Sequence, residues 1–325
     1  MTTLNHRASI HIVNSQRGVA ILLALLVMAV LASLAGTAIA THWAQQSNSS
    51  TVQKNMQHDA ILMSAQQWGQ AILINDAKTT DIDSLEEPWA TPRNPTSLTE
   101  FLNLPREESS TEAKDSDNAV VYSRIEDLTA KWNILSLRGT PEENQYQMLS
   151  RKIATDVGIE PERFIRLVAA APLERPEGWT GGSSMLRSPQ GPEACLLWLG
   201  LTAKEIALTK DLITCLPTFD AGLNLNTVPP KFFEWLFEPE IAAILIKERG
   251  EKPFQSITDA AQRAKVPESM FPFFFFGNPA VGWSVKSNWF AIHTQVTIGD
   301  ISFGSTQTVH RLGAIIQVMN TIPVF

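Results

Sequence analysis

The chain has 325 residues, of which 44% are hydrophobic and 18% charged, and its net charge is −7. These values are ordinary for a folded protein with one large domain or two small ones. Six histidines and two cysteines supply few ligands for metal or redox chemistry. The residues after 44 carry 24 basic and 33 acidic side chains. An acidic body disfavours nucleic-acid binding, because that binding depends on neutralising phosphates.

One N-terminal segment is long enough to cross a membrane. Val19 to Ala40 is a run of 22 residues without a charged side chain. As a helix it would be about 33 Å long, against about 30 Å for the hydrocarbon core of a bilayer. Arg7 and Arg17 precede the run, and the acidic body follows it. The positive-inside rule therefore predicts a single-pass protein with its N-terminus in the cytoplasm.

A polar, basic leader ending in Gln16-Arg17-Gly18 leads directly into this run. The junction resembles the leader of type IV pilins and pseudopilins, which prepilin peptidase cuts after the glycine. The resemblance implies cleavage between Gly18 and Val19, followed by N-methylation of Val19. Two alternatives stay open: an uncut membrane anchor, and cleavage by signal peptidase after Ala38-Ile39-Ala40.

Leu23 occupies the fifth position counted from Val19. Pilins and major pseudopilins carry glutamate there, and in that family the carboxylate meets the terminal ammonium of the subunit assembled before. Opposite charges in lipid stabilise each other, whereas either charge alone is costly. A subunit that is assembled first has no predecessor to pair with. The missing acid at Leu23 therefore predicts a position at the tip of an assembly.

Helical spacing of apolar residues continues beyond the membrane run, without proline between residues 41 and 77. We expect one long helix from Val19 to about Ala77, half of it packed on a domain. Residues 79–118 contain four prolines and a charged run, which predicts a connecting segment. Residues 119–134 mix β-branched and aromatic residues in partial alternation, which predicts a pair of strands.

Helix signals dominate the stretch from residue 140 to 280. Capping motifs occur at Thr140-Pro141-Glu142-Glu143, at Thr202 to Glu205 and at Ser256 to Asp259. Strand patterns return near residue 283, where three antiparallel strands are expected. The sequence thus predicts an α+β fold in which a large all-helical insertion interrupts a helix-on-sheet domain.

Residues 223–261 look like a helix-hairpin-helix unit, with Asn224-x-Asn226-Thr227 as its lead-in and cap. Such units often hold a DNA phosphate with backbone N–H groups of a glycine-bearing hairpin. Here the hairpin is Phe237-Glu238-Pro239-Glu240, which has no glycine, two acids and a proline that lacks the donor. A packing role is favoured, and a pilin-like DNA receptor is the alternative function.

Three features occur in order: the N-terminus without glutamate, "IEDLTAKWNILSL" (125–137) and "DLITCLPTFDAGLNLNTVPPKFFEWL" (211–236). Over most of the chain this combination resembles the minor pseudopilin K of type II secretion systems. The resemblance implies a pilin-like fold in the bacterial inner membrane, with a periplasmic body at the pseudopilus tip. It also implies a tip complex with minor pseudopilins I and J. Other pseudopilins, prepilin peptidase and the inner-membrane secretion platform are further implied partners.

The implied function is to help initiate pseudopilus assembly, and so to support export of folded proteins across the outer membrane. The corresponding parts are the leader 1–18, the transmembrane and stalk helix 19–77, the first part of the pilin-like domain 78–139, the helical insertion 140–280 with its hairpin unit 223–261, and the C-terminal strands 281–325.

No enzyme is expected, because the catalytic motifs of hydrolases, zinc proteases and nucleotide-binding enzymes do not occur. A periplasmic hydrolase released at Ala40 would need such a site. His293 and His310 are expected on adjacent strands without an acid or nucleophile beside them. The phenylalanine-rich stretch 271–276 is expected to pack at the join between insertion and sheet or, if exposed, to form a docking patch.

Cys195 and Cys215 are the only cysteines, and an oxidising periplasm favours a disulfide between them over two buried thiols. Members of the pseudopilin K family often bind calcium with an acidic run. At the corresponding place this chain keeps Glu174, Glu177 and Glu193 without an aspartate cluster. Calcium takes six to eight oxygen ligands. No cofactor is therefore expected, the metal ligands are unknown, and calcium is left open.

Overall fold

The computed structural model describes residues 16–101, 119–134, 145–169, 191–216, 222–271 and 282–324. The chain divides into two compact units, Met1–Ala60 and Ile61–Phe325. Helix α1 (Gln16–Thr79) contributes to both. It begins three residues before the predicted start and ends two residues after the predicted end.

The described part of unit one is the first part of α1. Its segment Ile21–Trp43 spans 23 residues with a mean hydropathy of 2.5, and none of it is buried. Large apolar side chains such as Leu22 and Leu26 are exposed all round the helix. A helix that is apolar on every side is suited to lipid. This segment is therefore long and apolar enough to cross a membrane, a property that signal sequences share.

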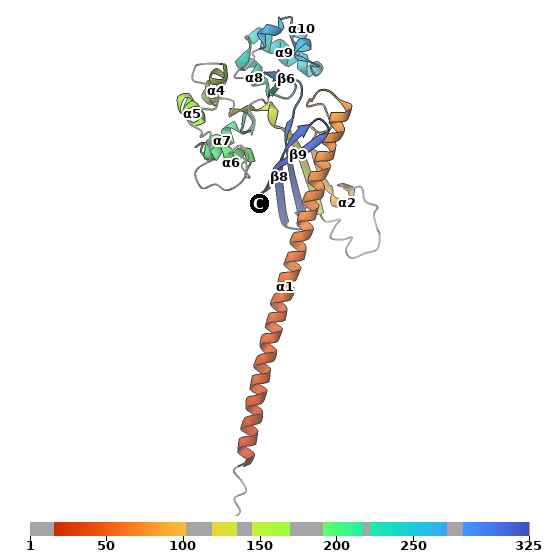
Figure 1. Cartoon of the computed structure of the whole chain (residues 1–325), viewed down its shortest axis with the longest axis vertical. Coiled ribbons are helices and arrows are strands. Elements are labelled where there is room, and N and C mark those ends of the chain that lie inside the picture. The colour runs from red at the N-terminus through yellow and green to blue at the C-terminus, as the bar shows by residue number, and fades with distance from the viewer. Residues whose placement is uncertain are drawn as a thin grey trace, which may run out of the picture. The chain divides into compact units, whose positions relative to one another are not determined.

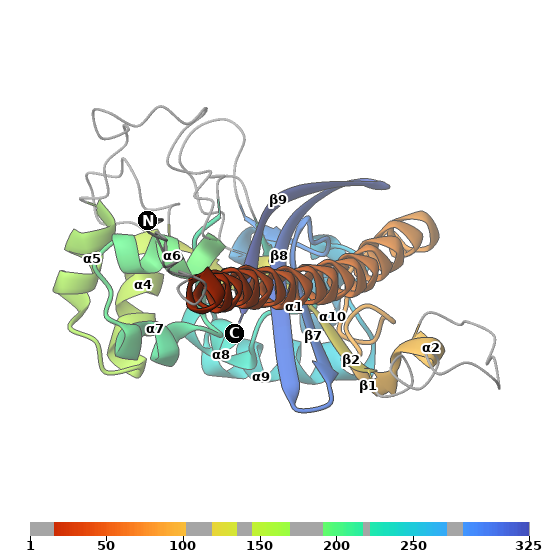
Figure 2. The same cartoon turned by 90° about the horizontal axis from the view of Figure 1, so that it is seen from below.

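Unit two is built on a five-stranded antiparallel sheet with the strand order β1-β2-β7-β8-β9. Its strands are β1 (Arg93–Ser97), β2 (Ala119–Asp127), β7 (Trp289–Ile298), β8 (Ile301–Leu312) and β9 (Ile315–Val324). Figure 2 shows β1 and β9 at opposite edges of the sheet. Tight turns at Gly299 and Gly313, both with positive φ, join the last three strands. The three predicted C-terminal strands are confirmed.

The last part of α1 packs on one face of this sheet (Figure 1). The shared core has two clusters, Ile61, Ala65, Val121 and Val296 in the first and Leu73, Ile125, Phe290, Ile292 and Val309 in the second. Gly69 of α1 faces Ile292, and a Cβ at residue 69 would lie 2.8 Å from the Ile292 Cγ2 atom. The glycine therefore lets the helix approach the sheet closely.

The helical block lies between β3 and β6 in the chain and gathers into two groups of helices (Figure 1). They are α4 (Gln145–Asp156), α5 (Pro161–Ala169), α6 (Gly191–Trp198) and α7 (Ala203–Thr209) in one group, and α8 (Pro230–Leu236), α9 (Pro239–Glu251) and α10 (Ile257–Ala264) in the other. The block has its own core, which includes the fully buried Phe164, Phe232, Phe233 and Phe254. The capping box of Thr202 with Glu205 and the Ser256 cap are confirmed. The Thr140 motif lies outside the described residues.

Two short parallel pairings tie the ends of the block to its interior. Strand β3 (Trp132–Asn133) pairs with β4 (Ile213–Thr214), and β5 (Leu223–Asn224) pairs with β6 (Trp283–Ser284). The predicted all-helical insertion therefore also contains the short strands β4 and β5. Two-residue strands have no periodicity that a sequence pattern can reveal.

Two other local predictions differ from the structure. Residues 119–134 do not pair with each other, because β2 is one long strand between β1 and β7. The strand ends where the Asp127 side chain caps a 3₁₀ turn at Leu128–Ala130. The expected connecting segment 79–118 contains β1 and the short helix α2 (Leu98–Phe101).

Gly69 and Gly250 give a matched test of the helix-on-sheet packing. Gly250 of α9 has open space around its Cβ position. Alanine has a higher helix propensity than glycine at both sites, but only Gly69→Ala forces its methyl group against Ile292. We expect Gly69→Ala to be less stable than Gly250→Ala by about 1–3 kcal/mol in chemical denaturation of the full chain in detergent. Equal stabilities would contradict this packing.

Candidate functional site

The residues of the predicted cleavage junction lie in α1, in unit one. Gly18 and Val19 are both helical, and the Val19 and Leu23 side chains are exposed. No charged residue follows Val19 before the end of the apolar run at Ala40, so this part of α1 contains no acid. Cleavage after Gly18 and methylation of Val19 stay predictions.

Unit two contains a buried set of polar side chains, which we call the polar junction: Asp76, Asp83, Asp127, Asn224, Ser287 and Arg311. They come from the end of α1, the following loop, the end of β2, the helical block, the approach to β7, and β8. The junction therefore connects every layer of unit two.

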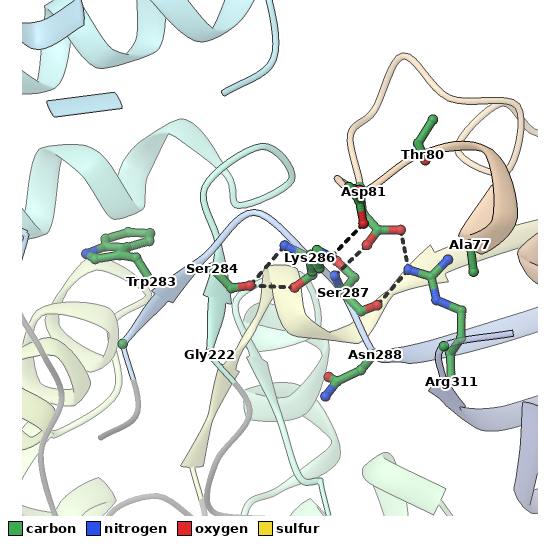
Figure 3. Close-up of a pocket in the computed structure, with 13 residues that line it drawn as sticks. Ala77, Thr80, Asp81, Gly222, Trp283, Ser284, Lys286, Ser287, Asn288 and Arg311 are labelled. Atoms are coloured by element: carbon green, nitrogen blue, oxygen red, sulfur yellow. Dashed lines mark hydrogen bonds and ion pairs between the residues drawn. The ribbon is translucent and has the colours of Figure 1, made fainter. Parts of the chain in front are cut away.

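Arg311 is the cation of the polar junction and is 7% exposed. Its Nη1 atom lies 2.8 Å from the Asp76 Oδ2 atom, and its Nη2 atom bonds Asp83. Nη2 also donates to the Ser287 carbonyl at 2.8 Å. Arg311, Ser287 and Lys286 line a pocket of about 490 Å³, and Figure 3 shows how their side chains lie. A planar guanidinium suits this arrangement, because it presents several donors in fixed directions.

Asp127 is the second centre of the polar junction. One carboxylate oxygen accepts hydrogen bonds from the Thr129 amide and hydroxyl at 2.7 and 2.6 Å. The other accepts from the Thr227 and Ser287 hydroxyls, each at 2.5 Å. A carboxylate that ends β2 thus holds the helical block through Thr227 and the approach to β7 through Ser287.

The Asn224-x-Asn226-Thr227 motif does not cap a helix, so that prediction is wrong. The residue before α8 is Pro229, which makes no side-chain capping bond. Asn224 Nδ2 donates to the Asp83 carbonyl at 3.0 Å and to the Ser287 hydroxyl at 2.7 Å. Asn226 instead exchanges two hydrogen bonds with the Phe254 backbone, at 3.0 and 2.8 Å. Asn224 and Thr227 therefore fasten the block to the sheet side of unit two, whereas Asn226 holds two parts of the block together.

Burial controls the ionisation of the polar junction. It raises the pKa of Asp76 to about 6, against the lowering effect of the Arg311 hydrogen bond. The neighbouring carboxylates of Glu87 and Asp83 raise the pKa of Asp76 further. Burial also raises the pKa of Asp127, although three hydroxyl groups and an amide stabilise its charged form.

The carboxylates of Asp76, Asp83 and Glu87 lie within 4.8 Å of one another. Arg311 occupies the first two, and Glu87 Oε2 accepts from the Ser84 amide and the Trp89 indole at 2.9 Å. This set does not fit calcium, because its oxygens already hold a cation and hydrogen-bond donors. Of the acids that the sequence left for calcium, Glu174 and Glu177 lie outside the described residues, and Glu193 lies in α6.

Cys195 of α6 and Cys215, directly after β4, form a disulfide with Cα atoms 6.2 Å apart. Closing a loop of about 20 residues contributes about 3 kcal/mol in the chain-entropy model. The bond holds α6 to the end of β4 inside the helical block. Of the phenylalanine-rich stretch, Phe271 is buried against Phe237 at 5.1 Å between ring centroids, and residues 272–276 lie outside the described residues.

Arg249 of the helix-hairpin-helix unit, and Arg263 two residues after its end, bond to groups of the helical block itself. Arg249 Nη1 donates to the Val228 carbonyl at 2.6 Å, and Arg263 Nε lies 3.1 Å from Glu248 Oε2. The hairpin residue Phe237 is buried and packs on Trp283. This arrangement favours packing over phosphate binding, as the hairpin sequence predicted.

His293 has an acid beside it, contrary to the prediction. Its Nε2 atom lies 2.8 Å from Glu126 Oε2, and its Nδ1 atom lies 3.0 Å from the Thr306 hydroxyl. Burial raises the pKa of Glu126, but hydrogen bonds from His293 and Lys131 outweigh it and lower the pKa to about 2. His310 stacks on Trp289 at 4.3 Å.

The fold is similar to that of a chain in the crystal structure of the GspK-GspI-GspJ complex from the type 2 secretion system of enterotoxigenic Escherichia coli. The match has a TM-score of 0.58 and 15% sequence identity, and it covers 84% of this chain and 99% of that chain. This similarity confirms the α+β pilin-like fold. No family model and no curated protein matches the sequence.

Asp76→Asn tests the electrostatics of the polar junction. Because the folded pKa of about 6 exceeds the ordinary value of 3.8, the native state binds a proton that the unfolded chain has released between these values. The contribution of Asp76 to stability is therefore full below pH 4 and decreases as the pH rises through 6. This decrease in the free energy of unfolding amounts to at most about 1 kcal/mol per pH unit, and we expect Asp76→Asn to abolish it.

The measurement is urea denaturation of the full chain in detergent between pH 4.5 and 6.5. Asp81→Asn is the matched control, because Asp81 is fully exposed and pairs only with Lys286 among the described residues. A pH profile of Asp76→Asn that coincides with those of the control and the parent chain would contradict the raised pKa.

Proposed function

We propose that this chain is a minor pseudopilin of the K type, which occupies the tip of the type II secretion pseudopilus and helps to initiate its assembly. Through that role it supports the export of folded proteins across the outer membrane. The observation that carries the proposal is the pilin-like fold, whose match to a chain in the GspK-GspI-GspJ complex covers 99% of that chain. The proposal assigns the chain no catalytic step.

The apolar segment of α1 supports a location in the bacterial inner membrane. On this proposal the basic leader stays in the cytoplasm, prepilin peptidase cuts between Gly18 and Val19, and Val19 is methylated. Unit two then folds in the periplasm, where an oxidising environment maintains the Cys195–Cys215 bond.

Leu23 gives the tip position its physical reason. A subunit that joins below another one must bring a carboxylate to the ammonium of its predecessor, since an isolated charge in lipid is costly. A leucine at this position provides no such partner. The chain is therefore suited to start the assembly, while its own N-terminal ammonium can receive the carboxylate of the next subunit.

The expected partners follow from the same comparison. The similar chain was crystallised with two other proteins of its system, and we propose minor pseudopilins I and J as the direct partners here. Other pseudopilins and the inner-membrane secretion platform would contact the chain during assembly. Arg249 and Arg263, which bond within the helical block, give the DNA-receptor alternative less support.

Mass spectrometry of the N-terminus tests the assembly pathway. We expect the chain to begin at methylated Val19 in cells that contain prepilin peptidase, and to keep its full leader in cells without it. Gly18→Ala is the matched variant, because the change removes the glycine that the peptidase needs and keeps the helix. We expect this variant to keep its full leader even in cells that contain the peptidase.

Two outcomes would contradict the proposal. A chain that begins at Thr41 would be a released periplasmic protein. An intact leader in the presence of prepilin peptidase would indicate a plain membrane anchor.

A further inference from the structure

The sheet of unit two has a second face, opposite to α1, that carries polar side chains. On β2 the residues that point toward α1 are buried, and the alternating Tyr122 and Arg124 are partly or fully exposed. This face is hollowed by a groove of about 470 Å³. We call it the open-face groove and define it by Tyr122, Arg124, His293, Gln295, Ser302 and Thr306.

The strand register arranges the open-face groove in rows. Arg124 of β2 is opposite His293 of β7, which is opposite Thr306 of β8. The next row contains Tyr122, Gln295 and Gly304 and continues to Val324 of β9. Gly304 leaves the hollow open, and a Cβ there would lie 2.8 Å from the Thr294 carbonyl oxygen. A side chain at residue 304 would therefore collide with the neighbouring strand β7, and its absence leaves this part of the groove unfilled.

The charges along the groove do not balance. Glu126 is occupied on both oxygens, by Lys131 and by His293 at 2.8 Å. Arg124 reaches Glu126 only at 3.7 Å, and its side chain is 44% exposed. No acidic side chain is among the residues that line the groove within the described part of the chain. The guanidinium therefore retains donors that point to solvent, on a protein whose net charge is −7.

We propose that the open-face groove binds an acidic, extended segment of a partner protein, with one of its carboxylates on Arg124. Guanidinium and carboxylate match in geometry and charge. The Tyr122 hydroxyl and the Gln295 amide, which line the next row, suit the backbone groups of such a segment. An extended polypeptide is favoured over a small molecule because the residues that line the groove come from β2, β7, β8 and β9, so its polar groups are spread over several neighbouring strands. This site goes beyond the proposed function and does not depend on it.

The two tyrosines of the chain provide the readout. Tyr122 lies in the open-face groove, and Tyr146 lies in α4 of the helical block. We would label the full chain in detergent with 3-fluorotyrosine and assign its two ¹⁹F resonances with Tyr122→Phe. The probe is a capped Thr-Glu-Thr-Glu-Thr peptide, compared with its Gln and Lys counterparts and with free glutamate.

We expect the Glu peptide to shift the Tyr122 resonance until it saturates, with the Tyr146 resonance unchanged. The Gln and Lys peptides and free glutamate are expected to cause no saturating shift. Arg124→Gln should weaken binding of the Glu peptide by about tenfold. Arg166→Gln is the matched control, because Arg166 is an exposed arginine of the helical block with one long ion pair, 3.5 Å from Glu160.

The proposal is overturned if the Glu peptide leaves the Tyr122 resonance in place, or if the Gln peptide shifts it equally. An equal saturating shift with free glutamate would identify a small-molecule site instead. Equal affinities of Arg124→Gln and Arg166→Gln would exclude Arg124 as the carboxylate partner.

Discussion

A single buried guanidinium, that of Arg311, makes the layers of unit two depend on one another. It bonds Asp76 at the end of α1, Asp83 in the loop and the backbone at Ser287. Removing one partner from such a set leaves the other charges buried without compensation, which is strongly destabilising. The neighbouring Asp127 set extends the constraint to the helical block, so helix, sheet and block are positioned together.

This arrangement explains how a small sheet carries a large helical block. The two share few apolar contacts near Leu128, Leu216 and Trp289, and otherwise have separate cores. Hydrogen bonds from Asn224 and Thr227, together with the short parallel pairings, fix the orientation of the helical block on the sheet, because hydrogen bonds are directional and apolar packing is not. A rigid join of this kind suits a protein that would present its body at the end of a filament, as the proposed function requires.

The long helix, the C-terminal strands and two of the helix caps could be predicted, because each leaves a periodic or capping pattern in the sequence. The polar junction could not, since its members are up to 235 residues apart and meet only through the fold. One signal was available: Asp127 is an acid at a core-facing position of β2, a strand in which buried and exposed residues otherwise alternate. The acid beside His293 was missed because cross-strand register cannot be deduced from composition.

The proposed function requires that the chain starts the pseudopilus rather than forming its shaft. The most direct measurement is immunogold electron microscopy of pseudopili that assemble with an epitope-tagged copy of the chain, with a tagged major pseudopilin as the control. If the chain starts each filament, we expect one label at one end of each filament, and labels along the whole length for the control. Labels of this chain along the shaft, or none on any filament, would contradict it.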